Sequence, residues 1–163
     1  MRVEREGIIA MLCKAYWMEI AMVMRYRANS WADPAGAEQA GARGALAREL
    51  ARSSSEAIDE ELRHATHVAN RIRELYGVAP GSMSFQAEQS SLQPTRRQSA
   101  IVHAINDVIA AETDAIERYN TIIAATEDSD PLTNDVVSTI LIDEEDHRRM
   151  FEGFLREHQQ ALR

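Results

Sequence analysis

Two stretches of this chain decide its fold: EAIDEELRHATHVANRI at residues 56–72 and STILIDEEDHRRMFEGF at residues 138–154. Each stretch has apolar residues at helical spacing, and each places a Glu and a His three positions apart in the middle of the apolar face. These pairs are Glu61 with His64 and Glu144 with His147. Residues i and i+3 point the same way on a helix, so each pair can approach one ion.

The helical pattern extends over four segments of the chain, about residues 5–29, 45–76, 96–126 and 131–159. Breaks rich in Gly, Pro, Ser or Asp separate them, and Asp130 and Pro131 are expected to start the last helix. Each segment has one apolar stripe, and no stretch alternates with period two. We therefore predict an all-α, antiparallel four-helix bundle in which residues 1–163 form one domain. The second connection is the longest, so a long crossover should join two helical hairpins.

Composition narrows the possible functions. The chain has 163 residues, which is long enough to bury a core. Lys and Arg number 18 and Asp and Glu 26, so the formal net charge is −8. This acidic balance argues against binding to nucleic acid, because phosphate groups need a basic surface, and it favours binding of cationic ligands. Cys13 is the one cysteine, which excludes an intrachain disulfide and a cysteine-held metal cluster.

Residues 8–24 are rich in apolar side chains, as a targeting or membrane segment would be. Lys14 and Glu19 interrupt them, so there is no uncharged run of about 18 residues that could span a bilayer. The same charges are atypical of a signal peptide. We interpret the segment as a core helix and expect a cytoplasmic protein without a membrane partner.

Every apolar stripe contains a carboxylate, and two stripes also contain a histidine. The residues are Glu19, Glu61, His64, Glu112, Glu144 and His147. Burying four unpaired carboxylates would cost several kcal/mol each, and no Lys or Arg lies at these levels of the stripes. Two divalent cations would balance the four negative charges. Oxygen-rich ligation with one His for each metal is typical of iron or manganese.

With these residues in place, the sequence resembles the ferritin-like di-iron carboxylate superfamily, most closely the bacterioferritin branch and the related Dps-like proteins. The resemblance covers nearly the whole chain and is most specific in the two stretches quoted above. It implies a ligand set with defined roles. These roles are bridging for Glu61 and Glu144, terminal for Glu19 and Glu112, and binding of one metal each for His64 and His147.

The sequence also departs from this resemblance. Bacterioferritins bind haem through a Met directly after the ligand Glu of the second helix, and Leu62 occupies that position here, so no haem is expected. Only 16 residues follow His147, which leaves a dimer or a shell open as the homo-oligomer. Rubrerythrin-like peroxidases carry an extra Glu where this chain has Ala115, and they add a cysteine-ligated domain.

Four further residues are candidates to support the ligands. Metal-bound His usually donates its second ring N–H to a carboxylate, so we expect Asp143 to support His64 and Glu60 to support His147. Tyr26 and Tyr119 each follow a ligand Glu by seven residues. They are expected to hydrogen-bond ligand carboxylates or to be oxidised transiently. The alternatives are solvated surface acids and ordinary core tyrosines.

The resemblance implies a ferroxidase that binds two Fe ions per chain, with Mn as the other candidate metal, and oxidises Fe(II) with O₂ or H₂O₂ for iron storage or detoxification. One alternative is a di-iron or di-manganese oxidase or peroxidase with a permanent metal pair. A second alternative is a structural bundle whose metal ions only stabilise the fold.

Overall fold

The computed structural model describes residues 4–28, 42–86, 88–89 and 101–160. Within these ranges the chain forms four long α-helices and one short 3₁₀ turn, with no β-strand. The elements are α1 (Arg5–Ala28), α3 (Ala42–Glu74), η2 (Ser82–Ser84), α4 (Ile101–Thr126) and α5 (Pro131–Gln160). The predicted all-α class is confirmed.

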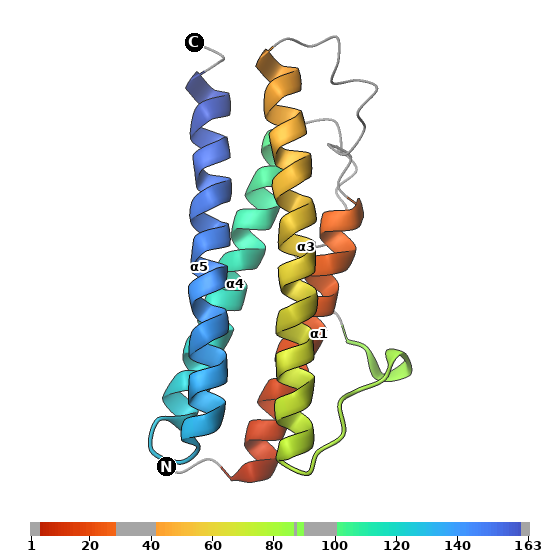
Figure 1. Cartoon of the computed structure of the whole chain (residues 1–163), viewed down its shortest axis with the longest axis vertical. Coiled ribbons are helices and arrows are strands. Elements are labelled where there is room, and N and C mark those ends of the chain that lie inside the picture. The colour runs from red at the N-terminus through yellow and green to blue at the C-terminus, as the bar shows by residue number, and fades with distance from the viewer. Residues whose placement is uncertain (1–3, 29–41, 87, 90–100, 161–163) are drawn as a thin grey trace.

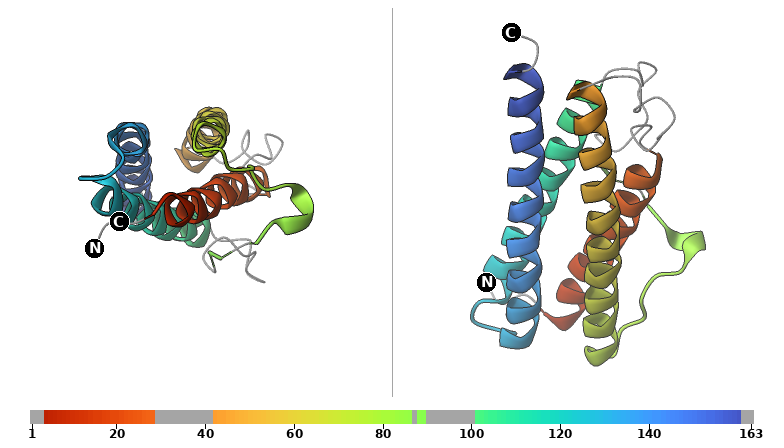
Figure 2. Two further views of the ribbon diagram at one scale, coloured as in Figure 1. Left: turned by 90° about the horizontal axis from the view of Figure 1, so that it is seen from below. Right: turned by 45° about the horizontal axis from the view of Figure 1, so that its top comes forward.

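The four helices form two hairpins laid side by side (Figures 1 and 2). Contacts are most extensive between α1 and α3 and between α4 and α5, and the hairpins meet where α3 packs on α5 and α1 on α4. Each helix is antiparallel to both of these neighbours, whereas α3 and α4 run in the same direction. The connection from α3 to α4 must therefore return along the length of the bundle, which confirms the predicted long crossover.

The helix bounds differ from the predicted segments at several ends. Helix α3 begins at Ala42, three residues before the predicted start, and so includes Gly44. A glycine inside a helix costs about 1 kcal/mol relative to alanine, which favourable packing can outweigh. Helix α4 begins at Ile101, and the predicted helical residues 96–100 lie outside the described ranges. On α5, Val137 is fully buried and Val136 only partly, so the apolar face passes through Val137.

The apolar core consists of two clusters with a polar layer between them. One cluster includes Met22, Leu50, Val108 and Phe151. The other includes Leu12, Val68, Tyr119 and Ile140. On each helix, the residues of the first cluster lie on one side of the ligand Glu and those of the second cluster on the other side. The apolar clusters thereby exclude water from both sides of the polar layer.

Helix α1 is long and apolar enough, by composition alone, to cross a membrane, with a mean hydropathy of 1.5. A core helix of a globular protein meets the same criteria. In this structure Ile8, Leu12, Ala15, Met18 and Met22 of α1 are buried against the other helices. We therefore interpret α1 as a core helix of the bundle.

The C-terminal end of α3 is closed by a residue with an unusual backbone conformation. Tyr76 has φ 62°, and the Tyr76 and Gly77 N–H groups donate to the carbonyls of Arg73 and Ile72, both at 2.9 Å. This arrangement is a Schellman motif, in which glycine is the preferred residue at the left-handed position. The Tyr76 side chain is 88% exposed, so packing offsets little of the backbone cost.

Replacing Tyr76 by glycine is expected to stabilise the protein by about 1 kcal/mol, because a left-handed conformation costs a non-glycine residue about that much. Urea denaturation checks this. The opposite change at the neighbouring residue, Gly77→Ala, should destabilise, because the added Cβ would lie 3.0 Å from side-chain atoms of both Ile72 and Ile9. An unchanged midpoint for Tyr76→Gly would contradict the argument.

Candidate metal centre

All four helices contribute a carboxylate to the polar layer, and α3 and α5 each add a histidine one turn later. Glu19 comes from α1, Glu61 and His64 from α3, Glu112 from α4, and Glu144 and His147 from α5. The four carboxylates are 0% exposed, and the histidines are 2% and 5% exposed. The structure thus brings together all six residues that the sequence singled out.

The six residues form two overlapping groups, each able to surround one cation. Glu19, Glu61, His64 and Glu144 form one group, and Glu61, Glu112, Glu144 and His147 form the other. Within each group, one potential ligand atom per residue lies within 4.8 Å of the others. Glu61 and Glu144 belong to both groups, so they lie between the two cation positions, where bridging ligands would be.

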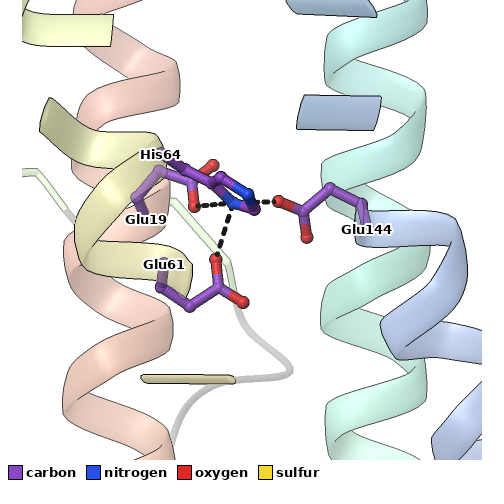
Figure 3. A group of neighbouring side chains, drawn as sticks. All are labelled: Glu19, Glu61, His64 and Glu144. Atoms are coloured by element: carbon purple, nitrogen blue, oxygen red, sulfur yellow. Dashed lines mark ion pairs between the residues drawn. The ribbon is translucent and has the colours of Figure 1, made fainter. Parts of the chain in front are cut away.

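Both imidazole rings direct Nδ1 toward the carboxylates. His64 Nδ1 lies 2.9 Å from Glu144 Oε1 and 3.5 Å from oxygens of both Glu19 and Glu61 (Figure 3). His147 Nδ1 lies 3.2 Å from a Glu61 oxygen. The two rings are 6.3 Å apart at their centroids. Each ring therefore offers one nitrogen to a separate cation position.

The hydrogen bonding of the inward atoms tests whether metal ions fit. Buried polar atoms are normally paired, and an unpaired carboxylate in an apolar core is costly. Several inward atoms have no hydrogen-bond partner among the described residues. They are Glu19 Oε2, Glu112 Oε2, both carboxylate oxygens of Glu61 and Glu144, and Nδ1 of His64 and His147. The two Nδ1 atoms lie 2.9–3.5 Å from several of these carboxylate oxygens without forming hydrogen bonds, and two cations would satisfy these atoms together.

The outward ring nitrogens do have partners. His64 Nε2 lies 3.1 Å from Asp143 Oδ2, and His147 Nε2 lies 2.6 Å from Glu60 Oε2. A carboxylate in this position accepts the Nε2–H and leaves the Nδ1 lone pair free for a metal ion. Glu60 and Asp143 are each 39% exposed, so they connect the buried rings to solvent.

Each of the two tyrosines donates a hydrogen bond to a carboxylate that belongs to only one of the two cation groups. Tyr26 on α1 donates to Glu112 Oε1 at 2.5 Å, and Tyr119 on α4 donates to Glu19 Oε1. Each tyrosine leaves the second oxygen of its partner carboxylate without a hydrogen bond. The phenols thus fix the orientation of Glu112 and Glu19 and leave one oxygen of each for a cation.

These outer contacts obey an internal twofold relation between the hairpins. The hydrogen bond from Tyr26 to Glu112 corresponds to the one from Tyr119 to Glu19. In the same way, the contact of Glu60 with His147 corresponds to the contact of Asp143 with His64. Each contact joins a residue of the α1–α3 hairpin to one of the α4–α5 hairpin. The candidate centre is therefore formed at the interface between the two hairpins.

Burial and mutual repulsion shift the protonation of the metal-free layer. Desolvation and the nearby carboxylates raise the pKa of Glu61, Glu112 and Glu144. Burial alone would lower the pKa of the two histidines, but the surrounding carboxylates raise the pKa by more. The net result is a raised pKa for His64 and a pKa of about 9 for His147. The metal-free layer therefore holds protons at neutral pH, and a bound cation would displace them.

Two buried arginines that the sequence pattern did not indicate lie beyond the polar layer. Arg25 and Arg71 are each 6% exposed, and they pair with Asp107 and Asp130. Arg25 follows the buried Met18 by seven residues, and Arg71 follows His64 by the same interval of two helical turns, so helical spacing could have identified both arginines as buried. Leu62, where a haem ligand would lie, is 45% exposed on α3.

Replacing Glu60 by alanine is expected to weaken metal binding by about 10- to 100-fold, because His147 would lose the acceptor that orients its ring. Isothermal titration with Co(II) measures the effect. Glu56→Ala is the matched control, since Glu56 lies one turn away on α3, is exposed and forms an ion pair with Arg52. Equal affinities for the two variants would contradict the assigned role of Glu60.

Comparison with known proteins is consistent with this geometry. Residues 42–161 match the ferritin-like domain family. No curated protein matches the sequence. Among solved structures, a bacterioferritin-related protein from Bacteroides fragilis, described as a dodecameric thioferritin, is 25% identical with a TM-score of 0.74. That match covers 98% of this chain and 90% of the other.

Two bacterioferritins share the fold at lower identity. The protein from Rhodobacter capsulatus is 24% identical with a TM-score of 0.72, over 98% of this chain and 89% of that one. The protein from Desulfovibrio desulfuricans, described with a diiron site, is 22% identical with a TM-score of 0.74, over 96% and 82% of the two chains. The family match spans most of this sequence and includes both Glu-x-x-His stretches, and the chain belongs to the ferritin-like domain family.

Proposed function

We propose that this protein is a ferroxidase, which binds two Fe(II) ions in the polar layer and oxidises them with O₂ or H₂O₂. The observation that carries the proposal is the set of unpartnered inward atoms, which two cations shared by Glu61 and Glu144 would satisfy. Carboxylate and imidazole ligands suit iron, and Mn(II) fits the same set. Haem is not part of the proposal.

The paired arrangement suits a two-electron reaction. Each Fe(II) gives up one electron. O₂ takes up the two electrons and two protons to give H₂O₂, or H₂O₂ takes up two electrons and two protons to give two water molecules. Because both electrons leave from adjacent ions, no one-electron oxygen radical needs to be released.

The residues of this chain bind, orient and exchange protons in that reaction. Glu61 and Glu144 hold the two ions together, and Tyr26 and Tyr119 orient Glu112 and Glu19. The protons held by His64, His147 and the carboxylates leave when Fe(II) binds. The apolar clusters exclude bulk water, which strengthens the attraction between ligands and ions.

The proposal includes a homo-oligomer in the cytoplasm. The relative from Bacteroides fragilis is described as dodecameric, which supports a shell for this chain as well. A shell would let the ferric product accumulate as a mineral, whereas a dimer would release or retain it.

An anaerobic Fe(II) titration followed by an air pulse tests the proposed activity. We expect near-ultraviolet absorbance to rise quickly, with the fast phase saturating near two irons per chain. Further uptake over repeated cycles would support storage. A pair that is oxidised once and never refills would overturn the ferroxidase proposal in favour of a permanent cofactor. No iron binding would mean that the bundle is structural.

A further inference from the structure

The six ligand residues are closed off from solvent in this structure. The six residues are at most 5% exposed. Two surface cavities formed by described residues, of about 460 and 700 Å³, are lined by none of the six. With the six residues buried to this extent among the described helices, we expect that some part of the bundle moves when an ion reaches or leaves the polar layer.

The interface between the hairpins is the part of the bundle with the fewest contacts. Packing within the α1–α3 and α4–α5 hairpins is far more extensive than packing between them. Both cation groups draw ligands from both hairpins. A small separation of the hairpins would therefore open both positions at once, whereas a motion within one hairpin would not.

A buried arginine crosses this interface at each end of the bundle. At the end where α1 finishes and α4 begins, Arg25 Nη2 lies 3.0 Å from Asp107 Oδ2. At the opposite end, Arg71 of α3 donates from Nη2 to both Asp130 oxygens, at 2.8 and 3.1 Å, and from Nε to Thr133 Oγ1 at 2.8 Å. The arginine side chains are 6% and 7% exposed, and Asp107 and Asp130 are 23% and 12% exposed.

Buried charge pairs of this kind resist separation. Pulling the partners apart leaves a charge in a partly desolvated position, which costs far more than breaking an exposed pair. Neither pair contains a ligand of the polar layer. The two pairs therefore oppose opening of the interface without contributing a ligand to either cation group.

We propose that Arg25–Asp107 and Arg71–Asp130 are two locks that control opening of the hairpin interface and thereby set the rate at which metal ions enter and leave the paired centre. The inference rests on the proposed function, since it assumes that the six residues bind metal. It assigns the exchange rate to residues outside the ligand set. Weakening either lock should speed release, while the ligands themselves stay in place.

The test measures Co(II) release, because Co(II) does not turn over with O₂ and absorbs visible light when bound. The full chain is loaded with Co(II) and mixed with excess EDTA, and the loss of absorbance gives the release rate. The variants are Asp107→Asn and Asp130→Asn, one at each end of the bundle. Both are isosteric, and asparagine keeps the N-cap function at residue 130. If one variant fails to fold, the other still tests the proposal.

We expect each variant to release Co(II) about tenfold faster than the original protein, as loss of one charge-assisted contact from the closed state implies. The matched control is Gly77→Ala, which disturbs packing between α1 and α3 inside one hairpin. It should lower the melting temperature but change the release rate less than twofold.

Three outcomes would overturn the inference. If both lock variants release Co(II) at the original rate, the ions leave by another route and the locks have only a structural role. If Gly77→Ala accelerates release as much as the lock variants, exchange follows global stability instead of the hairpin interface. If the original protein binds no Co(II), both the proposed function and the locks are wrong.

Discussion

Replacing Glu144 by leucine is expected to abolish binding of both metal ions and at the same time to stabilise the metal-free protein. Glu144 belongs to both cation groups, so its loss leaves neither group complete. Its carboxylate is 0% exposed, and the His64 Nδ1 atom lies 2.9 Å from Glu144 Oε1. Leucine removes one negative charge from a layer of four carboxylates and two histidines, which relieves the repulsion from Glu61 and the desolvation of one carboxylate, and we expect a gain of about 1–4 kcal/mol.

Equilibrium dialysis with Co(II) and urea denaturation of the metal-free protein measure the two effects. Glu112→Leu is the matched control: Glu112 is equally buried but belongs to one group only, so that variant should keep one ion per chain. The account would be contradicted if Glu144→Leu still bound two ions. It would also fail if that variant lost stability in the absence of metal.

The stability of the metal-free protein is expected to fall steeply between pH 6.5 and about 9. The pKa of His147 is about 9 in the folded protein against an ordinary value of 6.5, because nearby carboxylates favour the protonated ring. A raised pKa stabilises the fold fully below pH 6.5, and this contribution is lost as the pH rises through about 9. His64 and the carboxyls of Glu61, Glu112 and Glu144 also have a raised pKa, so they act in the same direction.

Bound metal should reverse this dependence. Cations displace the protons, and their affinity increases as the ligands deprotonate, so the loaded protein should keep or gain stability over the same range. Melting temperatures of metal-free and Co(II)-loaded protein across this range check both expectations. Protonation of Asp130 at low pH also lowers the stability of the folded protein. The pKa of Asp130 is below its usual 3.8, so this loss occurs at a lower pH than this range. Parallel pH profiles for the two forms would contradict the account.

The sequence predicted the fold and the composition of the candidate centre because helical periodicity constrains both. Glu19, Glu61, Glu112 and Glu144 interrupt otherwise apolar stripes, and an interruption at the same level on four helices places four side chains in one layer. The i, i+3 spacing then places each His beside its Glu. The contacts of Glu60 and Asp143 follow from the same register, because each precedes a ligand and lies at the edge of the buried face.

Contacts that depend on how the two hairpins meet could not be predicted in this way. The pairing of Arg25 with Asp107 joins helices that are distant in the sequence, and nothing local to either residue specifies the partner. The left-handed conformation of Tyr76 was also missed, since tyrosine gives no signal for a helix end that usually carries glycine. Helix ends such as the start of α3 depend on packing beyond local propensity.

The central claim is that these six residues bind two metal ions side by side, and anomalous diffraction from crystals soaked in Fe(II) tests it most directly. We expect two peaks per chain, about 3.5–4 Å apart as in other paired-metal centres, both lying between Glu61 and Glu144. One peak should lie next to His64 Nδ1 and the other next to His147 Nδ1. A single peak in the layer, or iron bound only at the protein surface, would contradict the account.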